Sequence, residues 1–273
     1  DEIERLGMLD RELGILFAQA TKRLLALAER QPQEIRAIGS HGQTVRHRPP
    51  SGGHAIGFSL QIGDPNTIAE LTGITTVADF RRRDIAAGGE GAPLAPAFHA
   101  AALSKSGVNR FIVNIGGIAN VTVLEGTALL MGFDTGPGNT LLDHWIASQR
   151  GEPFDRNGEW SATGRPHQAL LKDLLTHPYF RKQGPRSTGK EEFHLAWLET
   201  HLAEHGRLAA EDVQATLLEL TCTGIARAIQ SCPVDAGEVY VCGGGSHNQH
   251  LMARLAEILA PATVASTSAI GMD

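Results

Sequence analysis

Cysteine is scarce in this sequence, and the three cysteines that occur form no motif. Cys222, Cys232 and Cys242 include no Cys-x-x-Cys pair that could hold a structural zinc ion. A small, odd number of cysteines indicates reduced thiols, as in a cytoplasmic protein, and not a disulfide framework. His247 and His250 are close in sequence, but no nearby cysteine or acidic cluster completes a set of ligands. We therefore predict no metal site made by protein side chains alone.

The sequence also lacks a surplus of basic residues and a long apolar run. Its 24 lysines and arginines are outnumbered by 30 aspartates and glutamates, which gives a formal net charge of -6. This balance argues against a general nucleic-acid partner, because basic side chains are needed to neutralise phosphates. No apolar run is long enough to cross a bilayer, and the acidic residues 1–14 do not resemble a signal peptide. We expect a cytoplasmic protein with no membrane partner.

Strand and helix patterns alternate along the 273 residues, which suffice for one large domain or two medium ones. Apolar residues at three- and four-residue spacing predict a long helix over 2–30. Two β-rich runs around a Gly-Gly turn predict a hairpin over 110–124, and residues 238–259 are typical of a strand, a glycine turn and a helix. Strands that end in glycine turns and continue into helices indicate a mixed α/β fold with sites at the strand ends. The pattern changes at about residues 80–110, where we place the domain boundary, and we predict domains over 1–80 and 81–273.

Two glycine turns are candidates for binding a nucleotide. Gly243, Gly244 and Gly245 follow a short apolar strand and precede a helix, where backbone N–H groups can bind phosphate. The same pattern fits a plain strand-to-helix turn equally well. Gly116 and Gly117 form the tip of the predicted hairpin and could close over phosphates, although a lone Gly-Gly pair is more often only a turn. Neither turn has the spacing of the dinucleotide-binding fingerprint.

Residues 184–190, GPRSTGK, match the first seven positions of a phosphate-binding P-loop, but the match fails at the next position. A P-loop requires Ser or Thr there to bind magnesium, and this sequence has Glu191. We interpret the segment as a polar loop before a helix, with Ser187 and Thr188 as possible caps.

The segment 132–139, GFDTGPGN, contains the best candidate for a catalytic group. It places the carboxylate of Asp134 at the end of a strand, and Asn139 can cap the helix that follows. Such a carboxylate can deprotonate a hydroxyl or a water that attacks a phosphoryl or anomeric centre. An aspartate before Gly-Pro also commonly caps its own turn, and the residues alone do not decide between these roles.

Polar groups that suit a sugar or an anion follow two predicted strands in the first part of the chain. The turn 40–44 follows a strand over 35–40, and its hydrogen-bonding groups are typical of sugar recognition and equally of a satisfied turn. The three arginines 81–83 follow a buried strand over 74–80. Arginine can clamp a carboxylate or a phosphate, but we expect at least one of the three to be only a solvated surface residue.

Seven segments, in this order, resemble the signature runs of the anhydro-N-acetylmuramic acid kinases: IGSHGQTVRHRP, QIGDP, VADFRRRDIAAGGEGAPLAPAFH, NIGGIANVT, GFDTGPGNTLLD, STGKEEF and VCGGGSHN. The resemblance covers nearly the whole chain. It implies two ribonuclease-H-like α/β domains around a cleft, as in hexokinase, Hsp70 and actin. It also implies that ATP phosphorylates O6 of 1,6-anhydro-N-acetylmuramic acid while water opens the anhydro ring, a step of peptidoglycan recycling. The products would be N-acetylmuramic acid 6-phosphate and ADP.

The resemblance further implies a role for each candidate residue. Asp134 would be the general base that activates the water, after which O6 attacks the γ-phosphate of ATP. The candidates for the nucleotide are Gly116, Gly117, Gly136, Gly243, Gly244 and Gly245. The candidates for the sugar are Ser40, His41, Gln43 and Arg83, of which Arg83 suits the lactyl carboxylate. Mg²⁺ would bridge the phosphates, with protein ligands that the sequence does not identify.

Two segments of the family have no counterpart in this sequence. Members begin with a strand that carries a Gly-Thr-Ser-x-Asp-Gly-type phosphate loop, and they continue beyond residue 273 into a helix with an acidic substrate contact. We therefore expect the first domain to be incomplete and the completed protein to be a homodimer. A catalytically inactive fragment that still binds nucleotide or sugar is an alternative to the active kinase, and a kinase of a related sugar is a third possibility.

We expect a polypeptide of these 273 residues alone not to turn over the anhydro-sugar. Phosphoryl transfer depends on positioning, and one glycine hairpin can contact the phosphates from one side only. ADP release in the presence of 1,6-anhydro-N-acetylmuramic acid measures this. The comparison is a completed chain that carries the family's N-terminal strand and C-terminal helix, and equal rates from the two chains would contradict the expectation.

Overall fold

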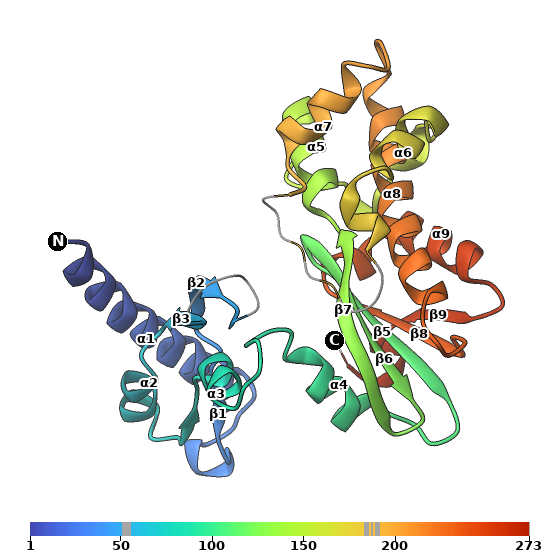
Figure 1. The fold of residues 1–273 in the computed structure, drawn as a ribbon. Helices are drawn as coiled ribbons and strands as arrows, with labels where there is room; N and C mark the ends of the chain where they lie inside the picture. Colours follow the sequence, from blue (N-terminus) through green and yellow to red (C-terminus); the bar gives the residue numbers. More distant parts are fainter. Residues whose placement is uncertain (51–55, 183–185, 187, 189–191, 273) are drawn as a thin grey trace. The chain divides into compact units, whose positions relative to one another are not determined.

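The computed structural model describes most of the chain, namely residues 1–50, 56–182, 186, 188 and 192–272 (Figure 1). These residues form two compact units, Asp1–Leu94 and Ala95–Asp273.

The first unit has the elements α1 (Glu2–Leu27), β1 (Ile38–Gly39), β2 (Gln43–Arg48), β3 (Phe58–Ile62), α2 (Pro65–Thr72), β4 (Thr76–Val77) and α3 (Phe80–Ala86). The predicted long helix is confirmed as α1. The two strands predicted around the polar turns are much shorter than expected, because β1 and β4 pair with each other in parallel over only two residues each. β2 and β3 form a separate antiparallel pair.

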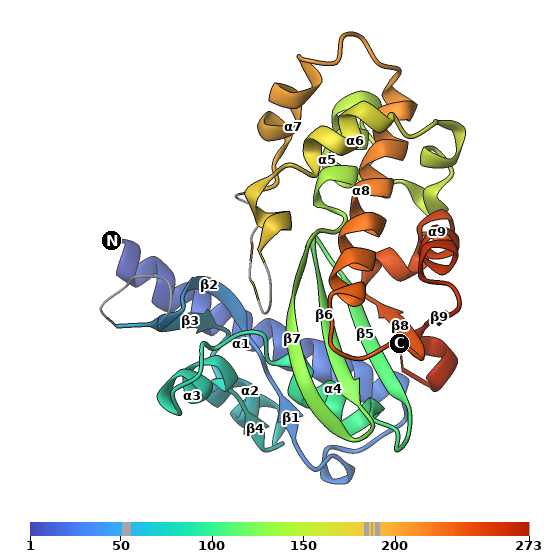
Figure 2. The same cartoon turned by 45° about the vertical axis from the view of Figure 1, so that its right-hand side comes forward.

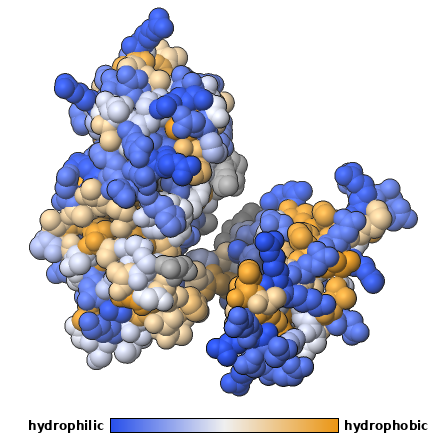
Figure 3. Space-filling view, turned by 180° about the vertical axis from the view of Figure 1, so that it is seen from behind, coloured by the Kyte–Doolittle hydropathy of each residue, from blue (hydrophilic) through white to orange (hydrophobic). Residues whose placement is uncertain are grey.

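Helix α1 packs against α2 in the first unit at a close approach of the two backbones. A Cβ atom on Gly14 of α1 would lie 2.8 Å from the carbonyl oxygen of Asp64. Asp64 also starts α2, since its carboxylate accepts the backbone N–H groups of Asn66 and Thr67, both at 3.0 Å. Figure 3 shows apolar side chains exposed on the first unit. Those on α1 are Ile3, Met8, Leu9, Leu16, Leu24 and Leu27.

The first unit continues to residue 94, beyond the boundary that the sequence suggested at 80/81. Arg81 ties the later segment to the rest of the unit, because its Nη1 atom donates to the carbonyl of Gly91 and its Nε atom to His41 Nε2, both at 2.9 Å. The division between the two units at 94/95 lies within the span of about residues 80–110 in which the sequence pattern changes.

The second unit contains one five-stranded sheet and most of the helices. Its elements are α4 (Ala95–Leu103), β5 (Asn109–Ile115), β6 (Ile118–Glu125), β7 (Ala128–Pro137), α5 (Thr140–Arg150), α6 (Gln168–Leu174), α7 (Leu195–Leu202), α8 (Ala210–Gln230), β8 (Glu238–Cys242), α9 (Gln249–Leu259) and β9 (Thr263–Ser266), with short 3-10 turns between them. The strand order is β7-β6-β5-β8-β9. β5, β6 and β7 form an antiparallel meander, and β8 and β9 run parallel to β5. This mixed sheet confirms the predicted α/β class and is the arrangement expected of a ribonuclease-H-like domain.

The core of the second unit lies between the sheet and α8, which is buried along most of its length (Figure 2). Side chains alternate across a strand, so Phe111 and Val113 of β5 join this core, whereas Ile112 joins a smaller cluster with Leu103 of α4. Helices therefore cover both faces of the sheet, and the strand ends are left to form the site.

Candidate nucleotide and catalytic site

Two of the predicted glycine turns are neighbours because β5 and β8 run parallel. Asn114 near the end of β5 lies opposite Cys242 at the end of β8, so the turns that follow the two strands emerge side by side. A Cβ atom on Gly243 would lie 2.4 Å from Asn114 Oδ1, and one on Gly245 would lie 2.4 Å from Ile115 Cγ2. Only glycine leaves room for these side chains at the two positions.

The turn between β7 and α5 joins the same place. The backbone N–H groups of Gly138 and Asn139 donate to the carbonyls of Gly117 and Gly116, at 2.9 and 2.8 Å. The side chain of Asn139 was predicted to cap α5, but it makes no capping bond and its Nδ2 atom donates to the carbonyl of Ile115 at 3.2 Å. The start of α5 is thus bonded to the tip of the β5–β6 hairpin.

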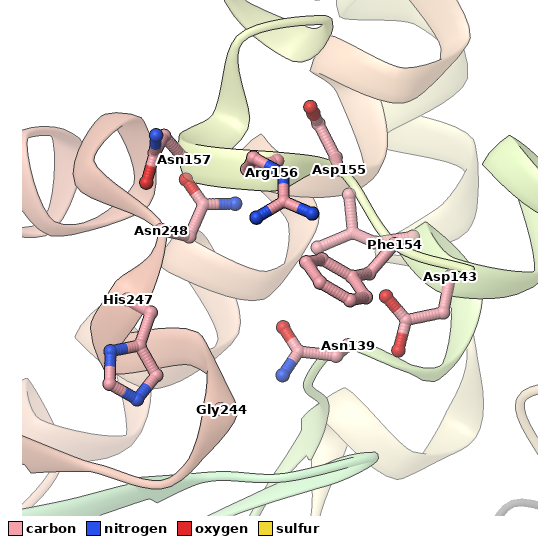
Figure 4. A pocket seen from close by; sticks show the side chains of 10 residues that line it. Asn139, Asp143, Phe154, Asp155, Arg156, Asn157, Gly244, His247 and Asn248 are labelled. Carbon is pink, nitrogen blue, oxygen red and sulfur yellow. The ribbon is translucent and has the colours of Figure 1, made fainter. Parts of the chain in front are cut away.

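A cavity of about 430 Å³ opens beside these turns, a size usual for small-molecule sites (Figure 4). The residues that line it are Asn139, Leu142, Asp143, Phe154, Asp155, Arg156, Asn157, Gly244, His247 and Asn248. They come from α5, from the segment after α5, and from the glycine turn and the start of α9. Of the predicted nucleotide residues, Gly244 lines the cavity directly, Gly116, Gly117, Gly243 and Gly245 belong to the neighbouring turns, and Gly136 lies in β7.

The segment after α5 is held rigidly as one wall of the cavity. The buried carboxylate of Asp155 accepts the backbone N–H groups of Trp160 and Ser161, both at 2.9 Å. A Cβ atom on Gly158 would lie 2.2 Å from Asn248 Oδ1, so this segment packs directly on the start of α9.

The cavity presents both an apolar and a cationic surface. The guanidinium of Arg156 lies 5.6 Å from the centroid of the Phe154 ring, within the range of a cation–π contact. Figure 4 shows the two side chains beside each other, with Asn139 and His247 on the other side of the cavity. The lining thus combines an aromatic face, a guanidinium, the carboxylates of Asp143 and Asp155, and several amide groups. Sequence reasoning missed this wall, because nothing in residues 154–157 resembles a motif.

Asp134 lies on β7, opposite Asn120 of β6, close to the tip of the glycine hairpin. Its backbone N–H group donates to the carbonyl of Arg186 at 2.9 Å, and its backbone carbonyl accepts from the hydroxyl of Tyr179. Its Oδ2 atom accepts the backbone N–H group of Thr188 at 3.0 Å. The carboxylate therefore binds a distant backbone group, a contact that no local pattern indicated.

Arg186 and Thr188 are the residues of the P-loop-like segment 184–190 that the structure describes, and both form hydrogen bonds with the catalytic candidate. The prediction that Ser187 is a cap lies outside the described residues. Gly136, one of the predicted nucleotide-binding residues, lies near the end of β7 with φ of 132°, and a Cβ atom there would lie 3.0 Å from the ring of Phe180. Aromatic side chains thus pack against this part of the turn.

The sugar candidates lie in the first unit, where Ser40, His41 and Gln43 surround the turn between β1 and β2. The amide of Gln43 donates to the carbonyl of Thr44 at 3.1 Å. Arg81 is the arginine that reaches this turn, through its bond to His41, and burial lowers its pKa from the usual value. Arg83 is exposed.

The helical geometry of α3 explains why the two arginines differ. Residues two positions apart in a helix do not share a face, so Arg81 and Arg83 cannot both point to the same turn. The sequence contained this signal, but using it requires knowing that the helix already begins at Phe80.

Two classes of site are absent from the described part of the chain. No group of three or more His, Cys, Asp or Glu side chains within it is arranged to hold a metal ion. None of the helices in that part is long and apolar enough to span a membrane.

Comparison with known proteins places the whole chain in one family. The family model for anhydro-N-acetylmuramic acid kinase matches residues 1–273. Proteins with this name from Shewanella sp. (strain ANA-3) and Shewanella baltica (strain OS223) are 56% and 55% identical, over 100% of this chain and 73% of each relative. Among solved structures, the activator of 2-hydroxyisocaproyl-CoA dehydratase from Clostridium difficile is similar with a TM-score of 0.41 and 14% identity, covering 84% of this chain and 86% of that one. The chain belongs to the anhydro-N-acetylmuramic acid kinase family.

Proposed function

We propose that this chain provides the nucleotide site and the catalytic base of a kinase that acts on 1,6-anhydro-N-acetylmuramic acid. ATP phosphorylates O6 while water opens the anhydro ring, and the products are N-acetylmuramic acid 6-phosphate and ADP, as peptidoglycan recycling requires. The observation that carries the proposal is the position of Asp134, held near a glycine hairpin whose neighbouring turns border a cavity of nucleotide size.

The nucleotide occupies the cavity of the second unit. The adenosine lies between Gly244 and the wall formed by Phe154 and Arg156, and the phosphates extend towards the hairpin tip at Gly116 and Gly117. Mg²⁺ bound together with the nucleotide would neutralise part of the charge of the phosphates. The residues that line the cavity all belong to the second unit.

Asp134 acts on the water that opens the ring. The carboxylate takes a proton from the water as the water oxygen bonds to C1, and the C1–O6 bond breaks with its electron pair on O6. O6 then bonds to the γ-phosphorus, and the bond from that phosphorus to the bridging oxygen of ADP breaks. The proton leaves Asp134 for solvent. The N–H group of Thr188 orients the carboxylate for the first step by its bond to Oδ2.

The sugar contacts come from the first unit. Arg83, exposed on α3, pairs with the lactyl carboxylate, and the turn that contains Ser40, His41 and Gln43 binds the hydroxyl groups. Arg81 fixes this turn through its bond to His41. A cytoplasmic homodimer with ATP and the amino sugar as its small-molecule partners completes the proposal.

An inactive chain that only binds nucleotide is the second candidate, and the location of the cavity within one unit favours it for these 273 residues. Titration with ATP followed by an assay of ADP release separates the two candidates. Binding without turnover in both this chain and the completed chain would support the second.

We predict that Gly244→Val weakens ATP binding at least about tenfold and changes sugar binding by less than about twofold. A tenfold loss of affinity corresponds to only ~1.4 kcal/mol of binding free energy. A Cβ atom on Gly244 meets only Asn139 Nδ2, at 3.5 Å, so it fits without a clash, and Gly244 lines the cavity that a larger side chain would narrow. Gly117→Val, at the hairpin tip, is expected to show the same preference. Calorimetry measures both affinities.

Gly243→Val is unsuitable for this test, because its side chain would strike Asn114 and disturb the fold itself. If Gly244→Val keeps the thermal midpoint of the parent and binds ATP with unchanged affinity, then the glycine turn does not border the nucleotide.

We predict that Asp134→Asn lowers turnover of the completed chain by roughly 10²–10⁴-fold, the usual loss on removing a general base. The amide oxygen of asparagine can still accept the N–H group of Thr188, so ATP binding should remain nearly intact. Asp235→Asn is the matched control, because Asp235 is exposed in the same unit. Turnover of Asp134→Asn within a few-fold of the control would remove Asp134 from this role.

A further inference from the structure

Tyr179 is a buried residue whose hydroxyl is directed at the backbone of the catalytic candidate. It lies in the 3-10 turn Pro178–Arg181, its side chain is fully buried, and its hydroxyl donates to the carbonyl of Asp134. Burial raises the pKa of Tyr179 far above the ordinary value, so the hydroxyl keeps its proton and stays a donor. A core that needed only an aromatic ring at this position would be served by phenylalanine.

The ring of Tyr179 is fixed by other aromatic side chains. It meets Phe180 and Phe193 at centroid distances of 5.8 Å in both cases, with interplanar angles of 78° and 88°. Phe193 in turn meets Trp197 of α7 at 5.5 Å and 88°. Edge-to-face packing of this kind favours one orientation of each ring, so the hydroxyl of Tyr179 is held in a defined direction.

Three bonds from one later segment converge on Asp134. Tyr179 holds its carbonyl, the carbonyl of Arg186 holds its N–H group, and the N–H group of Thr188 holds its carboxylate. The guanidinium of Arg186 lies 5.2 Å from the ring centroid of Tyr179 and 5.7 Å from that of Phe133, which precedes Asp134 in β7. The backbone and the side chain of Asp134 are therefore fixed together.

We propose that Tyr179 is a positioning residue for the reaction, which sets the place of the Asp134 carboxylate through the backbone carbonyl of the same residue. The inference rests on the proposed function, since it assumes that Asp134 is the base. The hydroxyl does not touch the reacting atoms. Without it, the end of β7 loses one of its fixed points beside the turn at Gly136, and small displacements of a catalytic group are costly to the rate.

Tyr179→Phe tests the proposal, with Tyr240→Phe as the matched control. These are the two tyrosines of the sequence. Each substitution keeps the ring and removes one hydroxyl, but the hydroxyl of Tyr240 donates to Glu238 Oε2 at 3.2 Å, on β8. In the completed chain we expect Tyr179→Phe to lower kcat about tenfold, within the range caused by misplacing a catalytic group. KM for ATP should change less than about twofold, and Tyr240→Phe should match the parent in both constants.

A merely structural role for Tyr179 would give a different result. It would lower the thermal midpoint and leave kcat per folded molecule equal to that of Tyr240→Phe, and this outcome would overturn the proposal. A loss confined to KM for ATP would overturn it as well, because the hydroxyl would then serve the nucleotide site.

Combining Tyr179→Phe with Asp134→Asn separates this inference from the proposed function. If both act through the same carboxylate, Tyr179→Phe should cause no further loss of single-turnover rate in the Asp134→Asn chain. A further tenfold loss there would contradict the proposal. If Asp134→Asn keeps the parent's activity, Asp134 is not the base and the proposed function is wrong. If Asp134→Asn loses most of its activity and Tyr179→Phe loses none, only the inference about Tyr179 is refuted.

Amide hydrogen exchange adds a readout that needs no activity and uses the 273-residue chain itself. The end of β7 around Asp134 should exchange faster in Tyr179→Phe than in Tyr240→Phe, while β5 exchanges equally in both. Equal exchange at the end of β7 in the two variants would contradict the proposed anchoring.

Discussion

The parallel pairing of β5 with β8 is the constraint on which the site depends. It brings the ends of two strands far apart in sequence next to each other, with Asn114 opposite Cys242. The glycine hairpin that follows β5 and the triple-glycine turn that follows β8 must then share one small space. Little room is left there, because a Cβ atom on Gly243 would lie 2.4 Å from Asn114 Oδ1 and one on Gly245 would lie 2.4 Å from Ile115 Cγ2. Glycine at positions 243 and 245 is thus required by packing before any ligand is considered.

The third turn shows how the same packing limits where phosphate can bind. The N–H groups of Gly138 and Asn139, just before α5, and that of Thr140, its first residue, donate to the hairpin carbonyls and are not available to an anion. A helix start alone would have suggested a phosphate site there. The nucleotide is instead expected along the cavity wall that contains Gly244, with the phosphates towards the hairpin tip.

Local patterns in the sequence were sufficient for the elements and for the turns. The long first helix, the hairpin and the strand–turn–helix around 238–259 all occur where the periodicity and the glycines indicated. These features depend on residues close in sequence, so they can be predicted without a structure. The exception is the pair β1 and β4, which are much shorter than the apolar runs suggested.

Contacts between distant residues could not be predicted in the same way. Tyr179 and Thr188 lie 45 and 54 residues beyond Asp134, and no periodicity links them to it. Arg81 rather than Arg83 contacts the polar turn because α3 begins at Phe80. A shift of the helix start by one or two residues would turn a different side chain towards the turn. The cavity wall at Phe154 is likewise a product of tertiary packing alone.

Amide NMR of this chain during titration with Mg²⁺ and ATP tests the central claim most directly. The account predicts that the shifts at saturation are concentrated at the hairpin tip 116–117, at Asn139, in the wall 154–157 and in the turn 244–248. Residues 1–94 should change little, because the cavity is formed within the second unit. Shifts confined to residues 1–94, or no shifts in the glycine turns at saturating ATP, would contradict it.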